Sequence, residues 1–168
     1  MSKFCTACAL HKEVIREVYG EGKLTARIMV IGEAPGRDED KVGRPFIGVS
    51  GRLLREALEP ILDECYITNM VKCFPHGTPN KKAISTCVNL HIPNQIRMIK
   101  PESIILVGGI AKKNFPTNIS TATIYTIYHP AYSIRGYMPR DKYKEHVATV
   151  LQPLFEKYKR ELTITKYE

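Results

Sequence analysis

Two glutamates and one phenylalanine lie in a glycine-rich loop, residues 32–48, directly after an apolar run at 26–31. A short β-branched run that ends in Gly-x-x-Pro-Gly predicts a buried strand leading into a sharp loop. In an open parallel sheet, ligands bind outside the carboxyl ends of the strands. We therefore expect Glu33, Glu39 and Phe46 to lie where chemistry is done, with the loop glycines letting backbone approach a ligand closely.

Polar residues also occur at the ends of two further predicted strands. Asn69 lies near the end of the run at 65–71, and His129 follows the run at 123–128. The carboxyl ends of parallel strands meet at one edge of a sheet, so Glu33, Asn69 and His129 are predicted to converge on one site.

Predicted strands alternate with helical patterns along the whole chain. This alternation predicts a three-layer α/β domain with a parallel sheet, built as a single domain over residues 1–168. Two prolines, Pro60 and Pro93, are expected to shorten or break the helices that contain them. The predicted strands are 26–32, 65–71, 103–107 and 123–128, and the predicted helices are 9–19, 51–63, 81–99, 110–115 and 141–160.

The composition is that of a soluble globular protein. Of 168 residues, 43% are hydrophobic and 25% are charged, and no apolar run reaches the roughly 18–20 residues of a membrane span. The first residues lack the apolar core of a signal peptide, so we expect a cytoplasmic protein without a membrane partner. The net charge of +8 indicates a polyanion partner, although a lysine-rich solvated surface gives the same balance.

Four of the five cysteines have a spacing that can close a metal site. Cys5 and Cys8 form a C-x2-C motif, and Cys73 and Cys87 lie far downstream in the sequence. Tetrahedral zinc and a [4Fe–4S] cluster both accept four cysteine ligands, and the spacing alone does not separate them. Unligated thiols are the remaining alternative. Cys65 begins a predicted strand and is interpreted as a small buried apolar residue.

Together these motifs resemble the family 4 uracil-DNA glycosylases, the iron–sulfur-containing branch of the uracil-DNA glycosylase superfamily found in bacteria and archaea. The motifs occur in the family's order from about residue 5 to residue 135. The matching segments are Cys5-x2-Cys8, Gly32-Glu33-Ala34-Pro35-Gly36 with Glu39-Asp40, Gly43 to Gly48, Tyr66 to Cys73, Cys87, and Tyr128-His129-Pro130-Ala131-Tyr132.

The resemblance implies a structural [4Fe–4S] cluster on Cys5, Cys8, Cys73 and Cys87 and a four-stranded parallel sheet. It also implies a monomeric enzyme of a prokaryotic cell, such as a thermophilic archaeon, that starts base excision repair on uracil-containing DNA. The chain departs from the family in having short segments at 111–123 and between the last two cysteines.

The resemblance gives the predicted site residues chemical roles. Phe46 is expected to stack on a uracil flipped out of DNA, and Asn69 to read its edge, with Gly32 and Ala34 against the base. His129 is expected to donate a hydrogen bond to the departing base.

The acid that orients water or stabilises the sugar cation is less well defined. Ala34 stands where another branch of the superfamily has a water-activating Asp, which leaves the catalytic base open. We expect Glu33 to act ahead of Glu39, since Glu39 lies in a run of charged residues typical of a solvated loop. Each of the other positions also has a purely structural alternative: Phe46 could pack in the core, Asn69 could form a turn, and His129 could cap the end of a strand.

The segment after His129 is expected to contact DNA. Tyr132 or Ile134 is predicted to push into the duplex, and Arg135 to contact a phosphate.

Two other functions compete with a glycosylase. A non-catalytic iron–sulfur nucleic-acid-binding protein of the same superfamily would lack a complete pocket, and a dinucleotide-binding protein would need a G-x-G-x-x-G motif, which does not follow the first strand.

Overall fold

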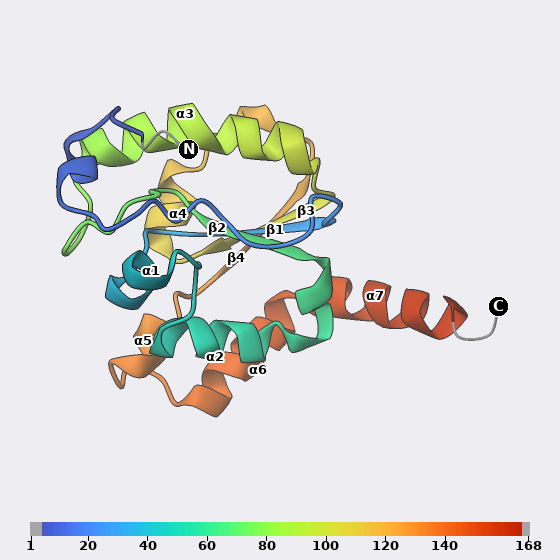
Figure 1. The fold of residues 1–168 in the computed structure, drawn as a ribbon. Helices are drawn as coiled ribbons and strands as arrows, with labels where there is room; N and C mark the ends of the chain where they lie inside the picture. The colour runs from blue at the N-terminus through green and yellow to red at the C-terminus, as the bar shows by residue number, and fades with distance from the viewer. Residues whose placement is uncertain (1–4, 166–168) are drawn as a thin grey trace.

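Four short strands form one parallel sheet at the centre of the computed structural model, which describes residues 5–165 (Figure 1). The order across the sheet is β2-β1-β3-β4. Gly32 pairs with Asn69 at the carboxyl ends of β1 and β2, and Val107 pairs with Ile127 at those of β3 and β4. The strands are β1 Ile28–Gly32, β2 Cys65–Asn69, β3 Ser103–Val107 and β4 Thr123–Ile127.

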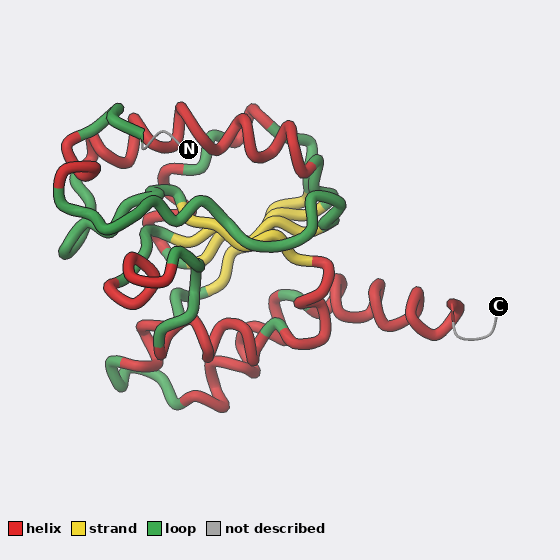
Figure 2. Tube along the Cα trace, in the orientation of Figure 1, coloured by secondary structure: helices red, strands yellow, loops and turns green. Residues whose placement is uncertain are grey.

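Helices cover both faces of the sheet, giving three layers (Figures 1 and 2). Successive side chains of β1 alternate between two hydrophobic cores, as the period of two of a strand requires. Ile28 and Val30 pack toward α2, α6 and α7, whereas Met29 and Ile31 pack toward α3 and α4. The helices are α1 Arg37–Val42, α2 Val49–Ala57, α3 Lys81–Ile99, α4 Gly109–Asn114, α5 Ala131–Ile134, α6 Arg140–Val150 and α7 Gln152–Thr165, with 3₁₀ turns η1 Ala9–Lys12, η2 Glu59–Glu64 and η3 Thr117–Ile119.

The predicted parallel three-layer fold is confirmed, and each predicted strand is present to within two residues at its ends. The helices differ more. The helix expected at 51–63 ends at Ala57, and Pro60 lies in the first turn of η2. Pro93 does not break α3. The helix expected at 141–160 is two helices, which meet at Leu151.

The helix predicted at 9–19 is wrong beyond its first turn. Only η1 is helical, and the chain then runs along the edge of the sheet, where the Val18 N–H donates to the Lys72 carbonyl at 2.8 Å. Glu21 forms an antiparallel bridge with Ile67 of β2. An edge strand leaves backbone groups unpaired, and this segment satisfies them, which outweighs the helical spacing of its apolar residues.

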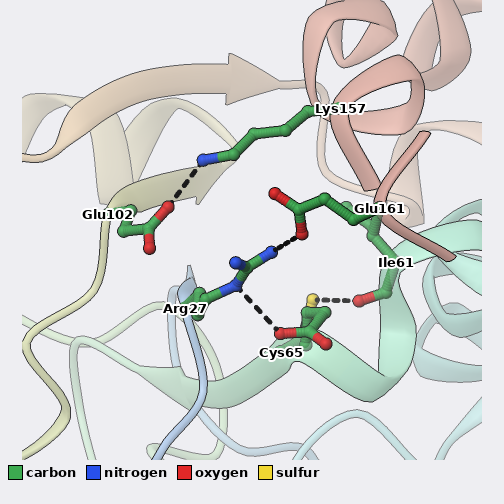
Figure 3. Close-up of polar contacts among 7 residues, drawn as sticks. Arg27, Ile61, Cys65, Glu102, Lys157 and Glu161 are labelled. Atoms are coloured by element: carbon green, nitrogen blue, oxygen red, sulfur yellow. Dashed lines mark hydrogen bonds and ion pairs between the residues drawn. The ribbon is translucent and has the colours of Figure 1, made fainter. Parts of the chain in front are cut away.

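Charged side chains hold α7 at the amino edge of the sheet (Figure 3). Arg27, just before β1, pairs with Glu64 and with Glu161 of α7, and its guanidinium lies 4.4 Å from the ring centroid of Tyr158. Lys157 pairs with Glu102 at 2.6 Å. Partly exposed ion pairs contribute little individually, but here several act on one helix. Within residues 5–165, no helix combines the length and apolar character required to cross a membrane.

Candidate active site

A cavity of about 260 Å³ opens at the carboxyl edge of the sheet. It brings together five of the residues predicted from the sequence, on three different chain segments. The other lining residues are Gly36, which precedes α1, and the residues at the start of α2. The lining residues are Ala34, Gly36, Glu39, Phe46, Gly48, Val49, Ser50, Gly51, Asn69 and His129.

Gly32 is the point where the pocket residues come closest together. A Cβ atom at this position would lie 2.3 Å from the Phe46 ring and 2.5 Å from Asn69 Oδ1. Neither side chain can move away freely, because both are almost completely buried. The end of β1 must therefore be a glycine for the ring and the amide to share one cavity.

Phe46 is held in a left-handed backbone conformation, with φ of 53°. This conformation costs a non-glycine residue about 1–2 kcal/mol, so surrounding groups must enforce it. Arg55 donates from Nε to the Phe46 carbonyl at 2.9 Å and from Nη2 to the Pro45 carbonyl at 2.8 Å. Gly51 of α2 packs directly on the Phe46 backbone, which leaves no room for a side chain there.

Asn69 presents a buried acceptor without a partner. The residue is 2% exposed, and no group among the described residues donates a hydrogen bond to its Oδ1. An unsatisfied buried acceptor costs about 1–3 kcal/mol, which an N–H group of a ligand would recover. The backbone of Asn69 is fixed by its pairing with Gly32 and by Lys72, whose Nζ donates to the Asn69 carbonyl at 2.6 Å.

His129 is set up as a neutral hydrogen-bond donor. The Ala131 N–H donates to Nδ1 at 3.1 Å, so in the neutral ring the proton is on Nε2. Burial, assisted by the positive charge of Arg135, lowers the pKa of His129 to about 4. The imidazole is therefore uncharged at neutral pH. Its ring centroid lies 6.1 Å from that of Phe46.

The two candidate acids lie in different surroundings. Glu39 is in the main cavity, but its Oε1 accepts hydrogen bonds from the backbone N–H groups of Ile47 and Gly48, each at 3.2 Å. Glu33 lines a neighbouring cavity of about 290 Å³, which shares His129 with the first. Burial raises the pKa of Glu33, and the charge of Arg135 opposes that shift.

Two of the three residues predicted to contact DNA border this second cavity. Arg135 and Tyr132 line it, and both are exposed. Tyr132 stacks on Tyr128 and Tyr137, whereas Ile134 does not line the cavity and is 37% exposed.

Two of the four predicted ligand cysteines, Cys73 and Cys87, have a thiol pKa that is raised by burial and by neighbouring cysteines. Burial raises the pKa of Cys73 to about 12, and the nearby Cys87, Cys8 and Cys5 thiols raise it further. The Lys72 N–H donates to Cys87 Sγ at 3.3 Å. Within the part of the chain that the structure describes, no three His, Cys, Asp or Glu side chains are arranged to hold a metal ion.

Cys65 lies apart from these four, as expected. It is 4% exposed, and its thiol donates to the Ile61 carbonyl at 3.3 Å (Figure 3). Burial raises its pKa to about 12, which is typical of an inert structural thiol.

Sequence reasoning missed three contributors to the site. Lys72 and Arg55 fix the backbone of Asn69 and of Phe46, and Gly51 makes room for the latter. Lys72 lies in a buried segment directly after β2, and a buried lysine needs a polar partner inside the protein. This position is therefore a signal that could have been used. No comparable signal marks Arg55, which looks like an ordinary surface residue of a helix.

Comparison with known proteins agrees with this geometry. A family model described as the uracil DNA glycosylase superfamily matches residues 19–154. The chain belongs to this superfamily.

The relatives place it in the type-4 branch. A type-4 uracil-DNA glycosylase of Sulfurisphaera tokodaii is 33% identical over 96% of this chain and 81% of that protein. Those of Pyrobaculum aerophilum and Thermotoga maritima are each 42% identical, over 66% and 67% of this chain. The chain spans 59% and 61% of the length of these last two relatives.

The packing of Gly51 on Phe46 predicts a large difference between two glycines. Gly51→Ala places a Cβ atom 2.1 Å from the Phe46 carbonyl carbon, and the crowding should lower the free energy of unfolding by about 1–3 kcal/mol. Gly109→Ala is the matched control, since a Cβ there meets nothing within 4 Å, and it should be neutral or slightly stabilising. Denaturant unfolding curves measure both. Equal stability of the two variants would contradict the proposed packing constraint.

Proposed function

We propose that this protein is a uracil-DNA glycosylase, which flips uracil out of DNA, hydrolyses its N-glycosidic bond and so starts base excision repair. The observation that carries the proposal is the buried Asn69 Oδ1, which has no hydrogen-bond partner among the described residues and lies in a cavity shared with Phe46 and the neutral ring of His129. A pocket with this complete set of groups favours a catalytic protein over a non-catalytic relative.

Asn69 supplies the base specificity in this proposal. Uracil presents an N3–H donor beside the O4 acceptor, which matches the carbonyl and amide ends of the side chain. Cytosine presents the opposite order, so its ring would leave buried polar groups unpaired. Mismatches of this kind can discriminate by about 10⁴-fold or more. A base inside duplex DNA cannot reach the pocket, so the uracil must first leave the stack, and Phe46 then supplies an apolar surface for it.

His129 stabilises the leaving base. Cleavage of the N-glycosidic bond builds negative charge on the uracil and positive charge on the sugar. The Nε2–H of His129 can donate to the developing anion, and this bond strengthens only as the charge grows. A neutral ring suits the task because its pKa near 4 removes any dependence on protonation at neutral pH.

Glu33 is the acid we assign to the sugar side. One oxygen of Glu39 already accepts two backbone hydrogen bonds, which supports a bracing role for Glu39 in the loop at 47–48. Glu33 has no such partner among residues 5–165 and lies beside His129 and Arg135. From there its carboxylate can orient a water molecule or stabilise the positive sugar.

Cys5, Cys8, Cys73 and Cys87 would hold a [4Fe–4S] cluster. The donor chemistry fits four-thiolate ligation, and Cys5 and Cys8 lie near enough to Cys73 and Cys87 to raise the pKa of both thiols, although the described side chains are not arranged around a metal ion. When bound, the cluster would cross-link the N-terminal segment, the loop after β2 and α3, and it would take no part in base removal.

The setting we propose is a prokaryotic cytoplasm, with the protein acting as a monomer on DNA. The relatives above come from prokaryotes, and the net charge of +8 favours a polyanionic substrate.

A single-turnover assay on uracil-containing oligonucleotides, with thymine and hypoxanthine controls, tests the activity. Asn69→Asp should excise uracil more slowly and reject cytosine less strictly, because a carboxyl group presents a different set of donors and acceptors. Full uracil activity with unchanged cytosine rejection would show that Asn69 does not read the base.

His129→Ala should lower the single-turnover rate by about 10²–10³, or roughly 3–4 kcal/mol, while leaving affinity for uracil-containing DNA nearly unchanged. The parent rate should show no inflection near pH 6.5. The folded-state pKa of His129 is about 4, so the neutral form persists throughout that range and is lost only as the pH falls toward 4. A variant as fast as the parent, or a parent profile that bends near pH 6.5 and flattens in the variant, would refute this role.

The purified protein should contain about four irons per chain and be brown, because four cysteines are available as ligands. Replacing Cys87 by Ser should lower the iron content, whereas Cys65→Ser should retain it, since Cys65 lies outside the ligand set. Colourless protein with one zinc, prepared without oxygen, would contradict the iron–sulfur assignment.

A further inference from the structure

Four aromatic rings stack on one another beside the second cavity. We call Tyr128, Tyr132 and Tyr137 the tyrosine ladder. The ring centroids of Tyr128 and Tyr132 are 5.6 Å apart, and those of Tyr132 and Tyr137 are 5.2 Å apart. His146 of α6 stacks on Tyr128, with ring centroids 4.3 Å apart, and is the fourth ring of the stack.

The backbone of the ladder is fixed by hydrogen bonds. The Tyr128 N–H donates to His146 Nε2 at 3.2 Å, and the buried Tyr143 hydroxyl donates to the Tyr128 carbonyl at 3.0 Å. The Tyr137 N–H donates to the Tyr132 carbonyl at 3.1 Å. The rings are therefore already ordered before any partner binds, which reduces the entropic cost of binding.

The ladder nevertheless lies in solvent. Tyr128, Tyr132 and Tyr137 are 52%, 45% and 68% exposed. Contiguous exposed aromatic surface of this kind is typical of an interaction site. All three side chains line the cavity of about 290 Å³ that also contains Glu33 and shares His129 with the proposed uracil pocket. The surface thus continues directly from the proposed site of chemistry.

The ring spacing determines how a flat ligand can bind. Stacked nucleotides rise about 3.4 Å each, so a base between two tyrosines would need centroids roughly 7 Å apart, which the ladder does not provide. A base can stack on the outer face of Tyr137, the most exposed ring. Arg135, exposed and without an ion pair in the described chain, supplies a positive charge nearby for a phosphate. The Glu33 carboxylate in the same cavity disfavours a phosphate there and leaves that space to the uncharged parts of a nucleotide.

We propose that the tyrosine ladder is a stacking platform for unpaired bases of DNA, next to the pocket. That the bound strand is the one carrying uracil rests on the function proposed above, but the platform itself requires no uracil. Tyr132 is then part of the ladder and not free to push into a duplex, which leaves Ile134 as the residue for that role. The partner is single-stranded DNA, because paired and stacked bases expose no face to Tyr137.

Fluorescence anisotropy with a labelled, uracil-free oligothymidylate tests the platform, with a uracil-free duplex of equal length as the second probe. Tyr137→Leu keeps an apolar side chain but removes the ring, and it should weaken single-strand binding by about 5- to 100-fold, the range for one stacked base. It should leave duplex binding unchanged. Tyr137→Phe should bind both probes as the parent does.

Leu24→Ala is the matched control, because Leu24 is 61% exposed and precedes β1 at the opposite edge of the sheet. It should bind like the parent. Single-strand binding by Tyr137→Leu at the parent level, or an equal loss on both probes, would overturn the proposal. These probes contain no uracil, so the binding assay and the uracil-excision assay can fail independently. Absence of uracil release would refute the glycosylase function but not the stacking platform. Unchanged single-strand binding by Tyr137→Leu would refute the platform but not the glycosylase function.

Discussion

The buried amino group of Lys72 is the constraint around which the pocket side of the fold is arranged. The residue is 1% exposed, and burial lowers its pKa to about 7. Burial of such a group is costly unless all of its hydrogens are satisfied. Nζ donates to Thr68 Oγ1, the Asn69 carbonyl and Gln95 Oε1 at 2.6–2.7 Å, which uses all three donors of an ammonium group. Thr68 and Gln95 in turn donate to the Tyr19 carbonyl. One amine thus joins the end of β2, α3 and the N-terminal segment, and it fixes the backbone that carries Asn69.

The opposite wall of the pocket uses a different device. There the loop after β1 bends at Phe46, whose backbone is in the left-handed region. Arg55 donates a hydrogen bond to the Phe46 carbonyl, and Gly51 leaves space for the Phe46 backbone because it has no side chain. Glu39 braces the same loop through the backbone of Ile47 and Gly48. Both walls therefore rest on charged side chains bonded to main chain, and among the described residues the Asn69 Oδ1 facing the cavity is left without an internal partner. This is what preorganisation of a binding site requires.

The sequence predicts the sheet well because its strands are short β-branched runs bounded by breakers, and β1, β2 and β3 are buried on both faces. It also predicts that Glu33, Asn69 and His129 converge on one site, from parallel topology alone; Asn69 and His129 share a cavity, whereas Glu33 lines the neighbouring one. It does not predict that Glu33 lies in a separate cavity from Glu39, because that depends on the turn at Gly36 and on hydrogen bonds to residues 47–48. The sequence does not predict the extended course of residues 13–20 for a similar reason: the edge of β2 is a non-local partner, and the local pattern of apolar residues favours a helix. The roles of Lys72 and Arg55 depend on partners far along the chain that no local spacing reveals.

The N-terminal segment along β2 has a further consequence. It occupies the outer hydrogen-bonding edge of the sheet through the contacts of Val18 and Glu21. Between residue 5 and β1 the described segment forms one 3₁₀ turn as its regular element, so this stretch has little structure of its own to keep it in place. Detaching it would uncover unpaired backbone groups on a buried, β-branched strand, which is the surface on which chains associate edge to edge. The proposed cross-link at Cys5 and Cys8 would therefore protect the protein against aggregation. A protein without this cross-link is expected to self-associate through the edge of β2 before its pocket is damaged.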